Sequence, residues 1–289
     1  MGAVSLAILK PKNLSRRHHF IPKFYLKAWY EAKNSGFWVY TKTLEGELVA
    51  QKNKHAKSYC FEDDLYLLKP DGNSLVSSET DILEKEFFLP IDTRASSIHK
   101  KLLLTGISSL TAEDRINWAI FMLSLQLRSP EAMLQFVEQM RNELFNYDNF
   151  ELLARNAYLS NLPAMMLKIG AVEYITNMDW SIVKLPAEKE EHLLLGNNPL
   201  LIMPSDERSP IQVFSLAISP KQLLVMTVKD EEFDEGFCKL LPVYYSLNVI
   251  NQSEKYIISF KQLQDEAHLK YKKMAQLWSS GSFNNILFG

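Results

Sequence analysis

Cysteine, glycine and proline are scarce in this chain of 289 residues, which contains 2, 10 and 12 of them, respectively. The two cysteines, Cys60 and Cys238, lie far apart in no metal-binding spacing, so we expect free, buried thiols in a reducing compartment. Low glycine and proline content argues against long structureless segments. The sequence also lacks a nucleophile elbow, a Walker loop, a His-Glu-x-x-His zinc motif and a dinucleotide-binding glycine fingerprint. The enzyme classes that carry those motifs therefore have no direct support.

Long apolar runs and a strong charge of either sign are also missing. No segment approaches the roughly 18 apolar residues of a membrane span, and the first ten residues lack the basic start and the length of a signal peptide. Leu6 stands where a myristoylation signal needs Ser or Thr. With 32 basic and 34 acidic side chains the net charge is −2, which is not the overall footprint of a nucleic-acid binder, although it leaves room for a local basic patch. We expect a cytoplasmic protein with no membrane contact, in which residues 1–15 form a flexible arm.

The apolar and aromatic fractions, 47% and 11%, are sufficient for a sizeable core. The pattern near the start is extended, with predicted strands at 37–41 and 47–51 and an extended stretch at 58–68. The middle is helical. Helices are predicted over 79–89 (broken or kinked by Pro90), 93–104, 112–128, 130–146, 149–159 and 163–177.

After Trp180 the hydrophobic period changes to that of short strands. They are predicted at 180–185, 193–195, 200–203, 212–218 and 223–228, followed by a helix at 237–251, a strand at 255–260 and a helix at 262–278. The fold class that follows is α+β: a helical middle block with a mixed or antiparallel sheet built from N-terminal and C-terminal strands. No linker forces a division, so residues 16–289 are expected to form a single domain.

Residues 16–26, RRHHFIPKFYL, hold more catalytically usable side chains than any other stretch. In an extended backbone His18 and His19 point to opposite faces, so one metal ion would not bind both. A neutral imidazole suits general-base work or metal ligation, and Arg17 and Lys23 could neutralise a phosphate. The alternative is a structural hook at the start of a helix.

Two residues of the helical block are further candidates. Arg128 closes the helix predicted at 112–128, where it either caps exposed carbonyls or clamps an anion opposite His19. Glu84 is the best-placed carboxylate for a nuclease, although acidic residues early in a helix also favour the helix dipole. A divalent metal is the candidate cofactor, and no metal ligand is assigned.

Asn197 and Asn198 precede Pro199 between two apolar stretches. Turn chemistry accounts for this sequence, and the functional alternative is that the amides reach a ligand at the edge of the sheet.

The order of short motifs resembles one family, the mainly bacterial domain of unknown function 4238. The likeness covers about 16–262 and rests on 18–26 (HHFIPKFYL), 38–40 (WVY), Tyr59, 125–130 (LQLRSP), 196–199 (GNNP), 216–220 and 251–259. Members of the family usually carry Asp where this chain has Asn197, so any metal-binding or basic role of that Asp would be weakened here. The resemblance supplies no established activity, but it adds weight to the residues named above.

The function expected from these residues is that of a nuclease-like phosphodiesterase, or another enzyme acting on a phosphate-containing substrate such as nucleic acid or a nucleotide. His19, with His18 and Glu84, would be catalytic, and the substrate would contact Arg17, Lys23, Arg128, Asn197 and Asn198. The alternative is a non-catalytic interaction or regulatory protein, defence-associated, that binds a protein partner or forms a homo-oligomer.

Overall fold

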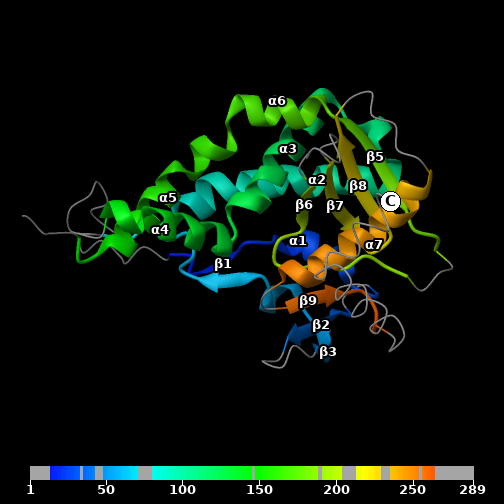
Figure 1. Cartoon of the computed structure of the whole chain (residues 1–289), viewed down its shortest axis with the longest axis horizontal. Coiled ribbons are helices and arrows are strands. Elements are labelled where there is room, and N and C mark those ends of the chain that lie inside the picture. The colour runs from blue at the N-terminus through cyan, green and yellow to red at the C-terminus, as the bar shows by residue number, and fades with distance from the viewer. Residues whose placement is uncertain are drawn as a thin grey trace, which may run out of the picture.

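The computed structural model describes residues 14–32, 35–42, 48–70, 80–144, 147–187, 191–203, 213–228, 235–253 and 256–263. The predicted arm up to residue 13, most of the predicted helix at 262–278 and Cys238 as a side chain lie outside this description. The described part has the predicted fold class: helices fill the middle of the chain, and antiparallel strands flank them on both sides (Figure 1). The buried apolar side chains form one cluster.

The helical block runs from the π-helix η3 (Leu83–Phe88) to α6. Its elements are α2 (Leu89–Thr105), the short η4 (Ile107–Ser109), α3 (Ala112–Leu127), α4 (Pro130–Leu144), α5 (Phe150–Met166) and α6 (Ile169–Asn177). Helix α3 begins where the sequence predicts: Thr111 accepts a hydrogen bond from the Asp114 N–H group, and Asp114 accepts one from the Thr111 N–H group.

Strands from the two ends of the chain share a sheet, as predicted. Strand β2 (Phe37–Lys42) pairs with β3 (Leu48–Lys54) on one side and with β9 (Tyr256–Ser259) on the other, both antiparallel. A separate four-stranded antiparallel sheet has the order β5-β8-β7-β6, from β5 (Asp179–Lys184), β6 (Leu200–Met203), β7 (Val213–Ser219) and β8 (Gln222–Thr227). Helix α7 (Glu235–Gln252) lies beside this sheet, between it and β9 (Figure 1).

The histidine segment lies where these layers meet. Strand β1 (Arg17–His19) pairs with β4 (Phe61–Asp63), and α1 (Lys23–Leu26) and η1 (Lys27–Trp29) follow it. The short η2 (Ala56–Ser58) precedes β4. Tyr25 of α1 donates a hydrogen bond to the Ala217 carbonyl in β7, and Trp29 donates one to the Leu193 carbonyl at 3.2 Å. The N-terminal segment is therefore joined to the distant four-stranded sheet.

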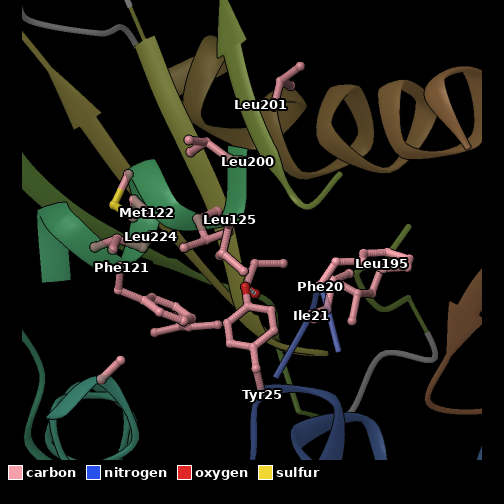
Figure 2. Packing of buried hydrophobic residues seen from close by; sticks show 14 of the residues in the cluster. Phe20, Ile21, Tyr25, Phe121, Met122, Leu125, Leu195, Leu200, Leu201 and Leu224 are labelled. Atoms are coloured by element: carbon pink, nitrogen blue, oxygen red, sulfur yellow. Dashed lines mark hydrogen bonds between the residues drawn. The ribbon is translucent and has the colours of Figure 1, made fainter. Parts of the chain in front are cut away.

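Apolar packing completes this junction. Phe121, Met122 and Leu125 of α3 lie against Leu200 and Leu224 of the sheet, and Tyr25 approaches the same region from α1 (Figure 2). All of these side chains are buried. Burial of this apolar surface fixes the end of α3, and with it Arg128, next to the histidine segment.

Two predicted helix breaks are wrong. Pro90 does not end a helix: η3 continues directly into α2, and Pro90 is the second residue of α2. Its missing N–H group leaves a carbonyl of η3 without a helical donor, but the buried Phe88 and Ile91 hold the helix against the core on both sides of it. Pro163 lies inside α5, because the fully buried Leu162 and Met166 hold the helix against the core on both sides of it.

Two predicted strands are also shorter than expected. Of residues 58–68 only Phe61–Asp63 form a strand, because Cys60 and Asp64, with φ angles of 55° and 59°, turn the chain at both ends. In the predicted strand at 193–195 only Leu195 pairs, in an isolated bridge with Ile258. None of the described helices is both long and apolar enough to cross a lipid bilayer.

Candidate functional site

The two adjacent histidines face opposite sides of β1, as the extended backbone predicts. His18 lies on the side where Tyr66 stacks on its ring at 5.3 Å. Its Nδ1 accepts a hydrogen bond from the Tyr66 N–H group at 2.8 Å, so its Nε2 carries the proton and donates to the Ser15 carbonyl at 2.9 Å. Both ring nitrogens are thus engaged by the backbone. Burial lowers the pKa of His18 and keeps it neutral. This arrangement leaves neither nitrogen for a metal ion or a substrate.

His19 lies on the other side of β1 and has one engaged nitrogen. Its Nε2 donates to the Ala56 carbonyl at 3.3 Å, which leaves Nδ1 as the unprotonated acceptor. The Phe61 ring packs on it at 5.5 Å, and the residue is only 9% exposed. Burial lowers the pKa of His19 to about 4, and the charges of Lys23, Arg17 and Arg128 act in the same direction. His19 is therefore a neutral imidazole with a bare nitrogen near several cations.

The two cations from the same segment are arranged differently. The Arg17 guanidinium lies over the Phe61 ring, 4.1 Å from its centroid, on the same side of β1 as His19. Lys23 begins α1 and is exposed. The charge of Lys23 lowers the pKa of His19 and also that of Glu84.

Arg128 follows directly after α3 and is 1% exposed. Its Nη1 donates to Asp92 Oδ1 of α2 at 2.9 Å, and its guanidinium lies 5.5 Å from the Phe88 ring centroid and 5.8 Å from that of Phe121. Its Nε and Nη2 are buried without a hydrogen-bond partner among the described residues. The prediction that this arginine caps helix carbonyls is wrong. A buried guanidinium with two unused donors is instead costly, and it is suited to an anion.

Glu84 lies in the π-helix η3, an irregular helix form that often occurs at functional sites. Burial raises the pKa of Glu84 to about 7, with a further contribution from the Asp92 charge, while Arg128 and Lys23 oppose the shift. Burial also raises the pKa of Asp92, against the effect of Arg128. Near pH 7 Glu84 is therefore an acid that can donate a proton.

These observations define a group of side chains that we call the His19 cluster: His19, Lys23, Glu84, Asp92 and Arg128. Arg128 acts on the pKa of His19, Glu84 and Asp92, and Lys23 acts on that of His19 and Glu84. The fold thus brings together β1, α1, η3, α2 and the end of α3. A base, an acid and two cations lie within electrostatic reach of one another.

Asn197 and Asn198 lie in the loop before β6, next to a second group of polar side chains. Asn197, 3% exposed, donates from Nδ2 to Glu131 Oε1 at 3.3 Å. Glu131 lies in the first turn of α4, three positions after Arg128. Its charge raises the pKa of Cys60 and of Tyr256, after the larger effect of burial.

The backbone links this second group to the His19 cluster. The Tyr256 hydroxyl accepts a hydrogen bond from the Cys60 N–H group at 2.6 Å, and the Cys60 carbonyl accepts one from Phe20, the residue after His19, at 2.9 Å. The asparagine loop is held by Gly196, since a Cβ atom there would lie 2.1 Å from Ser253 Oγ of the segment after α7. Asn197, through its bond to Glu131, therefore lies close to the corner between α3 and α4, and Asn198 follows it in the chain.

The structure assigns no ligands to the candidate divalent metal. Among the described residues, no three His, Cys, Asp or Glu side chains form a group that could hold a metal ion. Within the His19 cluster the carboxylate of Asp92 is paired with Arg128, and His19 is surrounded by cations.

Three residues of this region were missed by reasoning from the sequence: Asp92, Glu131 and Tyr256. Asp92 and Glu131 each lie in the first turn of a helix, where an acidic residue is expected for local reasons. Tyr256 begins a strand and looks like an ordinary aromatic strand residue. Only the three-dimensional contacts single them out.

The comparison with protein families gives a match to the one described as "Protein of unknown function (DUF4238)" over residues 17–260. The chain therefore belongs to this family. No curated protein and no solved structure gives a significant match. The match spans β1 to β9, so it includes the whole His19 cluster as well as Glu131, Asn197 and Asn198.

Proposed function

We propose that this protein is an enzyme that cleaves a phosphate-containing substrate, with nuclease-like phosphodiester hydrolysis as the reaction. One observation supports the proposal: the buried Arg128 has two N–H donors without a partner among the described residues, and its charge acts on a neutral histidine and on a carboxyl group whose pKa is about 7. Two parallel donors of a guanidinium match two oxygens of a phosphate. Lys23, and Arg17 beyond it, would add positive charge.

The chemistry follows from the protonation states. His19 Nδ1 would take a proton from a water molecule as that water attacks phosphorus. The bond from phosphorus to the leaving oxygen breaks, and Glu84 gives its proton to that oxygen. His19 then returns a proton to solvent and Glu84 regains one, so the cycle is balanced. A bound phosphate would raise the pKa of His19 from about 4 toward neutrality and strengthen it as a base.

The unpartnered atoms of Arg128 are closed off from solvent, so the cluster must open for a substrate to enter. Each buried donor without a partner costs about 1–3 kcal/mol. This cost destabilises the closed arrangement, and a phosphate that accepts hydrogen bonds from these donors would remove the cost. Lys23 and the half-buried Glu84 lie on the outer side of the cluster, where such an opening would begin.

A direct test uses the purified protein with RNA, DNA and nucleotides, each with Mg²⁺, Mn²⁺ or a chelator. We expect hydrolysis of at least one substrate and its loss in His19→Ala. A matched control is His55→Ala, because His55 is an exposed histidine outside the cluster. Absence of turnover on every substrate, or equal turnover by the wild type and His19→Ala, would contradict the proposed reaction.

The proposal places the enzyme in the cytoplasm, where its substrates and two unpaired cysteines are both expected. The competing function is a non-catalytic interaction or regulatory protein. The engaged His18 fits that function, since it holds the N-terminal segment to Tyr66. The unpartnered donors of Arg128 do not, because a structural arginine is expected to be fully paired.

A further inference from the structure

Three buried oxygen atoms of Glu131 and the asparagine loop have no hydrogen-bond partner among the described residues: Glu131 Oε2, Asn197 Oδ1 and Asn198 Oδ1. We call them the oxygen group. All three accept hydrogen bonds. A carboxylate can only accept, so Asn197 must turn its amino group toward Glu131, and its oxygen consequently points away. Three acceptors in neighbouring residues call for a ligand that donates.

Two kinds of ligand could satisfy these oxygen atoms, a metal cation or an uncharged group with O–H donors, and the charge of the site decides between them. A divalent cation prefers several oxygen ligands with more than one negative charge. The oxygen group has a single carboxylate, and the buried guanidinium of Arg128 is only three positions away in the sequence. An uncharged group with O–H donors needs no additional negative charge.

We infer that the oxygen group binds the hydroxyl groups of a ribose, so that the substrate is a ribonucleotide or RNA rather than its deoxy counterpart. This inference rests on the proposed function, because the sugar would lie beside the phosphate held by Arg128. Carboxylates are well suited to sugar hydroxyls, and the 2′-hydroxyl is the group that distinguishes RNA from DNA. The corner between α3 and α4 carries both Arg128 and Glu131, so it would join the phosphate-binding residue to one of the sugar-binding residues.

The test is equilibrium binding of adenosine 5′-monophosphate and of its 2′-deoxy analogue, measured by calorimetry on the full chain. We expect the wild type to bind the ribonucleotide about 10- to 100-fold more tightly, because loss of the hydroxyl leaves buried acceptors unpaired. Glu131→Gln replaces Oε2 with an amino group and keeps an oxygen for Asn197. It should weaken ribonucleotide binding to the level of the deoxy analogue and leave deoxy binding unchanged.

Two further variants keep the test decisive. Asn198→Ala removes one oxygen of the group, and none of the hydrogen bonds described involves the Asn198 side chain. This variant should therefore reduce the preference for the ribonucleotide, and it replaces Glu131→Gln if that variant fails to fold. Glu138→Gln is the control, since Glu138 is an exposed residue further along α4, paired with Arg141.

Equal binding of the two nucleotides by the wild type, or no binding of either, would overturn the inference. The first of these results leaves the proposed function intact, because Arg128 would still hold the phosphate. Failure of the proposed function has a different signature, namely that both nucleotides bind the wild type and Arg128→Lys equally well.

Discussion

The two sides of β1 differ in how completely their polar groups are paired. On one side, His18 uses both ring nitrogens, and Arg155 of α5 donates to the carbonyls of Leu67, Asp64 and Leu65 at 2.6–3.0 Å. On the other side, two donors of Arg128 have no partner in the part of the chain that the structure describes. Buried polar groups in folded proteins are nearly always paired, and the exceptions concentrate at functional sites. This difference is the reason for our proposal that the His18 side serves structure and the His19 side serves chemistry.

The largest expected effect separates the buried Arg128 from the half-buried Arg155. Arg128→Lys keeps the charge and loses the two-pronged donor geometry, so we expect hydrolysis to fall about 100- to 1000-fold. Arg155→Lys should instead lower the free energy of unfolding by about 2 kcal/mol, because buried carbonyls lose their donors. Activity per folded molecule should stay near that of the wild type. Steady-state kinetics and urea unfolding of both variants measure the two effects. Equal losses of activity, or equal losses of stability, in the two variants would contradict the prediction.

Glu84 provides the next largest effect. With a pKa of about 7 for Glu84 and about 4 for His19, kcat/KM of the free enzyme should be bell-shaped between these values. Glu84→Gln should lower activity about 100-fold and remove the alkaline limb. Glu86→Gln, which alters an exposed carboxylate of the same π-helix, is the matched control. A profile that keeps its alkaline limb in Glu84→Gln would show that another group is the acid.

The smallest effect is on the way the free energy of unfolding depends on pH. The pKa of His19 is lower in the folded protein than in the unfolded chain, so its contribution is complete above pH 6.5 and is lost as the pH falls toward 4. Glu84 acts in the opposite sense: its raised pKa means that stability falls as the pH rises from about 4.5 to about 7. His19→Gln should therefore reduce the loss of stability at acid pH by roughly 2 kcal/mol. Chemical unfolding at several pH values measures this, and identical curves for both proteins would contradict it.

Much of the fold follows from local sequence signals. The capping box at Thr111 fixes the start of α3, and the change from helical to alternating periodicity near Trp180 marks the second sheet. The errors occurred where tertiary contacts override local preferences. Pro163 is tolerated inside α5 because its neighbours are buried. Cys60 adopts a positive φ angle, which is not predicted for a cysteine.

Part of the candidate site could also be predicted from the sequence. The alternation of an extended backbone separates His18 from His19, and the structure places them on opposite sides. The approach of Arg128, Glu84 and Lys23 to His19 depends on the packing of α1, η3 and α3, which no local pattern encodes. Glu131 had a sufficient local explanation at the start of a helix, so nothing in the sequence distinguished it.

The adjacent histidines allow the most direct test of the central claim. His18→Gln and His19→Gln are the same change on opposite sides of one strand, and kcat/KM on the hydrolysed substrate is measured for the folded fraction of each. We predict that at pH 7 His19→Gln loses activity about 100-fold or more with little change in stability, whereas His18→Gln is destabilised by about 1–3 kcal/mol and stays active. Equal activity of the two variants, or loss of activity only in His18→Gln, would contradict the assignment of chemistry to the His19 side.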